Sequence, residues 1–305
     1  MKIPKIVVVG SSNTDMVVKS EKLPLPGETV LGADFLMNPG GKGANQAVAV
    51  ARLGGDVLFV CKTGRDVFGS QAVAHYNREG INTDYVFIDD FKASGVALIS
   101  VDGQGENSIV VALGANASLC KSDIDKVKAE VINADYVLMQ LEIPLDTVGY
   151  VTQLAFEHGV KVILNPAPAC SLPAELLPRL FMIVPNKSEA EMLSGISIKD
   201  WESAKDAARI IHEKGVGLVV ITLGEMGALV LEGNRFYQVA AETVTPVDTT
   251  AAGDTFCGAV AVALAEGKCL REAVAFANRA AAYSVMRMGA QSSIPFRRQL
   301  DDGEK

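Results

Sequence analysis

The order of strand-like and helix-like segments constrains the fold of this chain most. Short runs of β-branched and other apolar residues alternate with stretches of helical length over most of the 305 residues. This alternation is typical of βαβ units, so it predicts an α/β fold with a central, mostly parallel sheet flanked by helices. The expected strands are residues 5–10, 57–61, 136–141, 160–165, 181–185 and 218–222, and the first two helices are expected over residues 45–53 and 67–79.

Two segments interrupt this alternation. Residues 15–41 contain a Pro-Leu-Pro-Gly turn and a strand-like run but no helix, and residues 93–113 hold two strand-like runs around a Gly-containing turn. Each is too small to be stable alone, so we expect them to pair into a small β-sheet lid over the edge of the main sheet. The predicted division is a core of residues 1–14, 42–92 and 114–305 with a lid of residues 15–41 and 93–113.

Composition and charge exclude several function classes. Hydrophobic residues make up 49% of the chain and charged residues 21%, which is typical of a globular protein. The 36 acidic residues outnumber the 28 Lys and Arg, which gives a net charge of −8. Because nonspecific binding to nucleic acid or to an anionic membrane needs a basic face, we expect neither partner.

The sequence also indicates a cytoplasmic location. The apolar run at residues 6–9 is shorter than the apolar region of a signal peptide, which has roughly 7 to 15 residues. No stretch approaches the roughly 18 apolar residues of a membrane span. The five cysteines are scattered and never form a C-x-x-C pair, which favours reduced thiols over a disulfide framework or a structural zinc site.

The three histidines do not point to catalysis. His75, His158 and His212 all fall near the expected C-terminal ends of helices. An imidazole is stable at the negative end of a helix dipole, so this placement favours a structural role for each. It argues against most Ser-His-Asp triads and against histidine-ligated metal sites.

A glycine-rich segment near the N-terminus is a candidate ligand-binding turn. Residues 40–45 read GGKGAN, but Gly43 stands where a Walker loop needs Ser or Thr, and Gln46 stands where a dinucleotide-binding loop needs glycine. What remains is a turn leading into a helix, with Lys42 and Asn45 placed to hold hydroxyl groups. A turn with no ligand explains these residues equally well.

A second segment of small residues is the sharper candidate. Residues 248–256 read DTTAAGDTF and precede an expected helix at residues 258–266. Small residues at a helix start leave amide N–H groups uncovered, and the positive end of the helix dipole adds to the attraction for an anion such as a phosphoryl group. Asp254 would face a hydroxyl presented to that group. The alternative is that Asp254 only caps the helix.

These two segments resemble the paired motifs of the ribokinase family of carbohydrate kinases, the PfkB family. Between them, further motifs of the family follow in its order at residues 13–15, 140–142, 165–168, 185–189 and 222–227. The resemblance covers essentially the whole chain. It implies a ribokinase-like fold and an enzyme that transfers a phosphoryl group from ATP to an alcohol group of a sugar.

The resemblance implies phosphorylation of the primary 5-hydroxyl of D-ribose, giving ribose 5-phosphate and ADP. Other unphosphorylated substrates, such as deoxyribose, fructose or a nucleoside, stay open. A substrate that already carries phosphate would need further Arg or Lys residues in the sugar pocket, whereas Lys42 is the one basic residue among the implied sugar-binding residues. The alternative from another class is a noncatalytic sugar sensor, against which the intact Asp254 argues.

The resemblance also assigns roles to individual residues. Asp254 would remove the proton of the sugar hydroxyl, and the amides of residues 251–253 would stabilise the charge on the phosphoryl group. The implied anion-site residues are Ala251, Ala252 and Gly253. The implied sugar-binding residues are Asn13, Asp15, Gly41, Lys42, Asn45, Glu142 and Asp254, whose acids and amides suit neutral hydroxyls.

Nucleotide and metal sites are implied in the same way. The implied nucleotide-binding residues are Asn186, Thr222, Gly224, Gly227, Gly253 and Asn278. Asn186 and Glu189 match an element that holds Mg²⁺ through water, although the same pair has the form of a helix capping box. A K⁺ site is implied with side-chain oxygens of Asp248 and Ser293 and backbone carbonyls of Thr250, Ser284, Arg287 and Gly289.

Four further expectations concern the anion site, the nucleotide loop, the lid and the C-terminal tail. Ala251 stands where many family members have glycine, which narrows the approach to a phosphate. Glu225 adds a negative charge to the nucleotide loop, so we expect its side chain to face solvent. Because exposed strand edges favour pairing with another chain, a homodimer through the lid is implied. The polar tail, residues 296–305, is expected to fray.

Overall fold

The computed structural model describes residues 5–301, and within that range the predicted α/β fold is confirmed. The nine strands of the large sheet lie in the order β13-β12-β11-β10-β9-β8-β1-β4-β5. Their bounds are β1 Lys5–Val9, β4 Asp56–Gly64, β5 Val86–Asp89, β8 Tyr136–Met139, β9 Lys161–Leu164, β10 Met182–Ile183, β11 Leu218–Thr222, β12 Ala228–Glu232 and β13 Arg235–Val239. Neighbouring strands from β5 to β11 pair in parallel, and β12 and β13 add an antiparallel edge.

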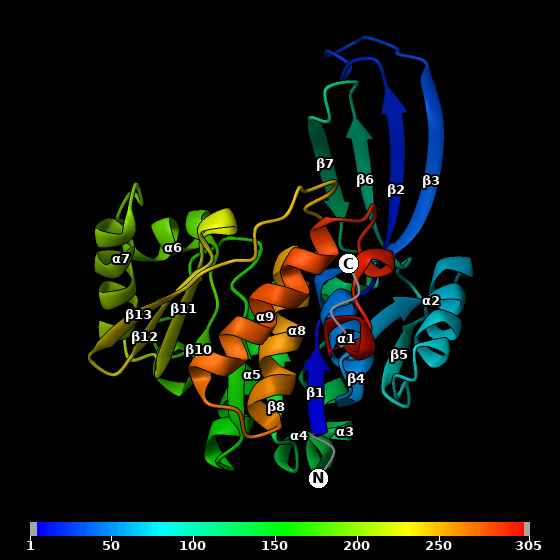
Figure 1. Ribbon diagram of the computed structural model, residues 1–305. Helices are drawn as coiled ribbons and strands as arrows, with labels where there is room; N and C mark the ends of the chain where they lie inside the picture. Colours follow the sequence, from blue (N-terminus) through cyan, green and yellow to red (C-terminus); the bar gives the residue numbers. More distant parts are fainter. Residues whose placement is uncertain (1–4, 302–305) are drawn as a thin grey trace.

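The central strands are buried on both faces, which explains their unbroken apolar sequences. In β1, Ile6 and Val8 belong to one apolar cluster, and Val7 and Val9 belong to the other. One cluster is covered by α1 (Lys42–Arg52), α8 (Ala252–Ala265), α9 (Leu270–Val285) and part of α2 (Val67–Arg78). The other is covered by α3 (Lys121–Lys126), α4 (Lys128–Ile132), α5 (Leu145–Glu157), α6 (Lys187–Ser194) and α7 (Trp201–Glu213) (Figure 1).

The two segments that interrupt the alternation do pair with each other. β2 (Asn13–Ser20), β3 (Gly32–Gly40), β6 (Gly95–Val101) and β7 (Asn107–Ala112) form a separate sheet in the order β3-β2-β6-β7. β2 and β6 come from the different segments and run parallel, whereas the outer pairs are antiparallel. This small sheet projects from the body at the end toward which β1 points (Figure 1).

The polar tail is more ordered than expected. Residues Arg297–Asp301 form α10, and the Arg297 guanidinium donates to Glu266 at 2.7 Å and lies over the Phe276 ring. These contacts anchor the segment although its sequence is polar, so the expected fraying is wrong up to residue 301; residues 302–305 lie outside the described range.

Within residues 5–301, no helix has the length and apolar composition needed to cross a membrane.

Candidate active site

The predicted site residues gather at the carboxyl ends of the parallel strands. Residues 11–13 follow β1, residues 140–142 follow β8, Asn186 follows β10 and Gly224 follows β11. The chain reaches β4 and β5 on one side of β1 and then crosses to β8 on the other side. A reversal of this kind leaves a crevice at the carboxyl ends, where ligands of open α/β sheets bind.

The start of α8 is the centre of this crevice. The helix begins at Ala252, six residues before the expected start at residue 258, so Asp254 lies in its first turn. Among the described residues, the amides of Gly253 and Asp254 meet no hydrogen-bond acceptor, whereas the Ala252 amide donates to the Thr249 carbonyl at 3.3 Å. Two first-turn amides are therefore free to bind an anion, and the third is weakly occupied.

Replacing Ala251 by Gly should stabilise the folded chain. Ala251 caps α8 with φ 59°, in the left-handed region that costs a residue with a Cβ roughly 1–2 kcal/mol. Glycine removes this cost but loses more conformational entropy on folding, so we expect a gain of about 1 kcal/mol. Urea unfolding measures the difference. A less stable variant would show that the methyl group contributes packing that outweighs the strain.

Asp254 is held by two side-chain amides from the first turn of α1. Its side chain is 6% exposed, and its oxygens accept from Asn45 Nδ2 at 2.9 Å and from Gln46 Nε2 at 3.0 Å. Burial raises the pKa of Asp254, while Lys42 and the two amides act in the opposite direction. The carboxylate is thus fixed in orientation and made more basic than an exposed one, which suits a general base.

The residues implied for sugar binding lie around Asp254. Glu142 accepts from the Ser11 hydroxyl at 2.5 Å and from the Lys42 backbone amide at 3.1 Å, and Asn13 Oδ1 accepts from Asn116 Nδ2 at 2.8 Å. Gly41 has φ 92°, and a Cβ there would lie 2.7 Å from the Asn13 amide nitrogen. Only glycine therefore lets this turn pass so close to the start of β2.

Charges in this cluster act on one another. Burial is the largest cause that raises the pKa of Asp15 to about 7, and repulsion by Glu142 and Asp254 adds to it. Burial alone would lower the pKa of Lys42, but attraction to Asp254, Glu142 and Glu189 outweighs it and the pKa rises. The cluster therefore offers acids and one ammonium group to the hydroxyls of a neutral polyol.

Replacing Asp15 by Asn should stabilise the sugar-free protein at high pH. An unfolded Asp has a pKa near 4, so between about pH 4 and about pH 7 the folded state keeps a proton that the unfolded state has lost. The stabilisation by this group is complete below about pH 4 and disappears as the pH rises to about 7.

At pH 8 we expect Asp15→Asn to exceed the wild type by about 1–3 kcal/mol in unfolding free energy and to bind sugar more weakly. Urea unfolding at pH 4, 6 and 8 and calorimetric sugar titration measure both effects. The same pH dependence of stability in both proteins would contradict the raised pKa of Asp15.

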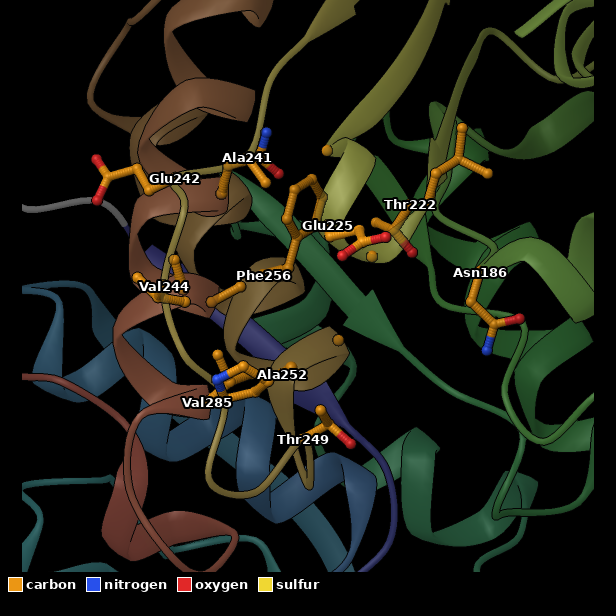
Figure 2. Close-up of a pocket in the computed structure, with 18 of the residues that line it drawn as sticks. Asn186, Thr222, Glu225, Ala241, Glu242, Val244, Thr249, Ala252, Phe256 and Val285 are labelled. Carbon is orange, nitrogen blue, oxygen red and sulfur yellow. The ribbon is translucent and has the colours of Figure 1, made fainter. Parts of the chain in front are cut away.

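A pocket of about 770 Å³ adjoins the start of α8: Ala252 and Gly253 line it, whereas Asp15, Glu142 and Asp254 do not. Its lining includes all of the residues implied for the nucleotide: Asn186, Thr222, Gly224, Gly227, Gly253 and Asn278. Figure 2 shows Val244 and Val285 on one side of the pocket and Asn186 and Thr222 on the other. Its size and its mixture of apolar walls and a few polar groups are typical of a small-molecule site.

Two side chains of this pocket have contacts or positions that the sequence did not predict. Glu225 is exposed, as predicted, but it also lines the pocket, so its charge lies at the pocket's edge. Asn278 uses its Nδ2 to bind the backbone carbonyls of Val239 and Ala240 at 2.9 and 3.0 Å. Only its amide oxygen is left for a ligand.

Asn186 and Glu189 form the capping box that the sequence allowed. The Asn186 side chain accepts from the Glu189 amide at 2.9 Å, and the Glu189 carboxylate accepts from the Asn186 amide at 2.8 Å. Glu189 is 5% exposed, and burial raises its pKa, partly offset by the Asn186 amide and by Lys42. Because the carboxylate interacts electrostatically with Lys42 and Asp254, it belongs to the same site as well as to the helix end.

Three of the six residues implied for K⁺ are joined by hydrogen bonds: Asp248, Thr250 and Gly289. The Asp248 carboxylate accepts from the Thr250 amide at 2.9 Å and from the Gly289 amide at 2.8 Å. Burial alone would raise the pKa of Asp248, but these hydrogen bonds outweigh it and lower the pKa. Ser284 lies near the end of α9, where its carbonyl accepts from the Arg287 amide at 3.2 Å, and Ser293 lies in the short helix Gln291–Ser293, where its hydroxyl donates to the Ala290 carbonyl at 2.8 Å.

The structure adds functional residues that the sequence did not reveal. Gln46 stands beside Asn45 in the chain, but adjacent helical residues point in different directions, so a shared partner was not expected. The Gln46 amide nevertheless donates to Asp254 and, at 3.2 Å, to Asn165. Ser11, Asn116 and Gln291 also bind implied site residues, and no sequence signal marked them.

Comparison with known proteins agrees with this geometry. A model of the family described as pfkB family carbohydrate kinase matches residues 3–297. The chain belongs to the pfkB family of carbohydrate kinases. Among the relatives of this family, the ribokinase of Haemophilus influenzae is 44% identical over 294 residues, covering 96% of both chains. The deoxyribokinase of Salmonella typhimurium is 36% identical, covering 97% of both chains.

A solved structure of a pfkB-type kinase extends the likeness to three dimensions. Arabidopsis thaliana ribokinase complexed with ribose and ATP superposes with a TM-score of 0.90 and 34% identity, covering 99% of this chain and 98% of that one. The pfkB family assignment means that the chain is a sugar kinase, and the fold predicted from the sequence motifs is confirmed.

Proposed function

We propose that the protein transfers the γ-phosphoryl group of ATP to the 5-hydroxyl of D-ribose. One observation carries this proposal: the first turn of α8 separates two chemically different sites. Gly253 lines the large pocket, while Asp254, one residue later, turns toward the polar cluster that contains Asn45 and Lys42. An alcohol on one side and a phosphoryl group on the other would thus meet at the same helix end.

Separate residues of this protein act as the base, stabilise the transferred phosphoryl group and bind the sugar. The buried Asp254 accepts the proton of the attacking hydroxyl, because two amides already hold its carboxylate in position. The amides of Ala251, Ala252 and Gly253 stabilise negative charge on the transferred group, and the unoccupied amide of Asp254 adds to them. Asn13, Asp15, Gly41, Lys42, Asn45 and Glu142 hold the sugar hydroxyls.

The nucleotide and the metal ions complete the proposal. The 770 Å³ pocket takes ATP, with its apolar walls against the base. Mg²⁺ would be held through Asn186 and Glu189 and would supply neutralisation of phosphate charge. K⁺ would suit the loops around Asp248, because hydrogen bonds lower the pKa of this carboxylate and favour its ionised form, and K⁺ would supply a fixed positive charge near the anion site.

Substrate choice is tested with a panel. ADP release is measured with D-ribose, 2-deoxy-D-ribose, fructose, adenosine and fructose 6-phosphate, with and without K⁺. We expect the highest kcat/KM for D-ribose, formation of ribose 5-phosphate and stimulation by K⁺. The deoxyribokinase relative makes 2-deoxy-D-ribose the main competitor. A higher kcat/KM for any other substrate would overturn the ribose assignment.

We infer that the small sheet, residues 15–41 and 93–113 in the predicted division, is a lid that also joins two copies of the chain. The face opposite Asp15 exposes large apolar side chains: Val18, Phe35, Met37, Leu98 and Val110. Pairing this face with a second copy would bury it. Sedimentation should show a homodimer that Leu98→Lys dissociates; a monomeric wild type would contradict the inference.

A cytoplasmic location is part of the same proposal. All five cysteines lie in the described residues and are free thiols, which suits a reducing compartment.

A further inference from the structure

A chain of hydrogen bonds leads from Asp254 to the other side of α1. Asn45 Nδ2 donates to Asp254 at 2.9 Å, and Gln291 Nε2 donates to Asn45 Oδ1 at 3.1 Å. The Gln291 amide oxygen then lies 2.8 Å from His75 Nε2. Gln291 is 1% exposed and belongs to the short helix Gln291–Ser293, while His75 belongs to α2. Three elements besides α8, which carries Asp254, are therefore connected to the carboxylate: α1, the short helix Gln291–Ser293 and α2.

The Asp254 carboxylate determines which atom donates in every hydrogen bond of this series. An ionised carboxylate can only accept, so Asn45 must present its amide N–H to Asp254 and its oxygen to Gln291. Gln291 must then donate with Nε2 and accept with its oxygen. His75 Nε2 is left as the donor, and this nitrogen carries a proton in the corresponding neutral tautomer and in the imidazolium alike.

The groups around His75 favour its neutral form, and His75 Nε2 can still act as the donor in that form. Burial is the largest cause that lowers the pKa of His75; Arg78 and Arg52 act the same way, and Glu79 and Gln291 oppose them. His75 Nε2 lies 4.0 Å from the Glu79 carboxylate. The imidazole is thus held in its neutral form with the proton on Nε2.

Further contacts fix the surroundings of Gln291 and His75, the two residues of the hydrogen-bond chain that lie farthest from Asp254. Arg52 Nη1 donates to the Gln291 backbone carbonyl at 2.7 Å, and the same guanidinium forms a two-pronged ion pair with Glu79 at 2.7 and 2.8 Å. The side chains of this pair are 10% and 12% exposed. His75 itself lines a separate groove of about 280 Å³ beside α2, and neither His75 nor Gln291 lines the large pocket.

We propose that Gln291 and His75 are positioning residues, which hold the Asn45 amide in the one orientation that donates to Asp254. This inference rests on the proposed function, in which Asp254 is the base. Without the Gln291 donor, the Asn45 amide could turn its oxygen toward the carboxylate. Asp254 would then have one side-chain amide donor, Gln46, and its charged form would be less stable.

The test compares Gln291→Leu, His75→Leu and His75→Gln with the wild type and with His158→Gln. His158 caps the end of α5, and its Nδ1 lies 2.9 Å from the Leu154 carbonyl oxygen of the same helix. The readouts are the pH profile of kcat/KM, the Kd of the sugar and the melting temperature. We expect both Leu variants to lose roughly 10-fold in kcat and to shift the acidic limb of the profile to higher pH. Gln at position 75 keeps a donor, so it should restore both.

Folded Leu variants with an unshifted acidic limb would overturn the inference while leaving the proposed function intact. A wild type without sugar kinase activity would overturn the proposed function instead. The ¹⁵N–¹H spectrum of the histidine rings then tests the hydrogen-bond chain directly. We expect His75 to be the Nε2–H tautomer, and we expect its signal to shift in Gln291→Leu. A neutral Nδ1–H tautomer would contradict the chain of donors in either case.

Discussion

Replacing Asp254 by Asn should lower kcat by about 100-fold or more. The carboxylate is buried, fixed by Asn45 and Gln46, and one residue from the amides that face the large pocket. Asparagine has nearly the same shape but cannot accept the hydroxyl proton. ADP release at saturating D-ribose and ATP measures the loss, and calorimetry should still detect sugar binding.

The matched control is Asp206→Asn on α7. Asp206 is a solvent-exposed acid that pairs with Arg209 at 2.7 Å, and its side chain is 57% exposed. Surface pairs of this kind contribute little, so kcat should stay at the wild-type value. If Asp254→Asn also retained wild-type kcat, Asp254 would not be the base.

Replacing Gly43 by Ala should lower the free energy of unfolding by about 3 kcal/mol or more. A Cβ at this position would lie 2.5 Å from the Ser11 amide nitrogen and 2.6 Å from the Gly10 carbonyl carbon. Both contacts are backbone, so no side chain can rotate away, and α1 must move from the end of β1. Because α1 carries Asn45 and Gln46, we also expect kcat to fall.

Gly149→Ala in α5 is the control for this change. An added Cβ at Gly149 meets nothing within 4 Å. Alanine has the higher helix propensity, so the variant should be more stable by up to about 1 kcal/mol. Urea unfolding compares the two variants with the wild type. A loss at Gly43 no larger than about 0.5 kcal/mol would show that α1 and β1 do not approach so closely.

Local sequence predicted the central parallel strands well because a strand buried on both faces needs a continuous apolar run. The strands at the two edges of the large sheet, β5, β12 and β13, were not predicted. β11 has the predicted bounds, and β1 ends within one residue of them. The starts of the two functional helices were less accurate. α1 begins at Lys42 and not at residue 45, because the Ala44 amide binds the Ser11 carbonyl at 2.9 Å and holds a glycine-rich turn in helical form.

α8 shows the same limit of local reasoning. Its first residues are small and have no strong helix signal, and the helix nevertheless begins at Ala252 with its cap in a left-handed conformation. From Thr255 to Ala263 every residue is buried between α1, α9 and the sheet, so tertiary packing stabilises a helix that intrinsic propensity only weakly favours.

The sequence by itself determined the α/β class, the pairing of the two β segments, the family motifs and the acid at position 254. Only the tertiary structure decided how that acid is held. Its partners Asn45 and Gln46 lie 209 and 208 positions away in the chain, and Gln291 reaches Asn45 across 246 positions. A hydrogen bond requires contact within about 3 Å and a defined direction, and contacts between such distant residues exist only once the strands and helices have packed.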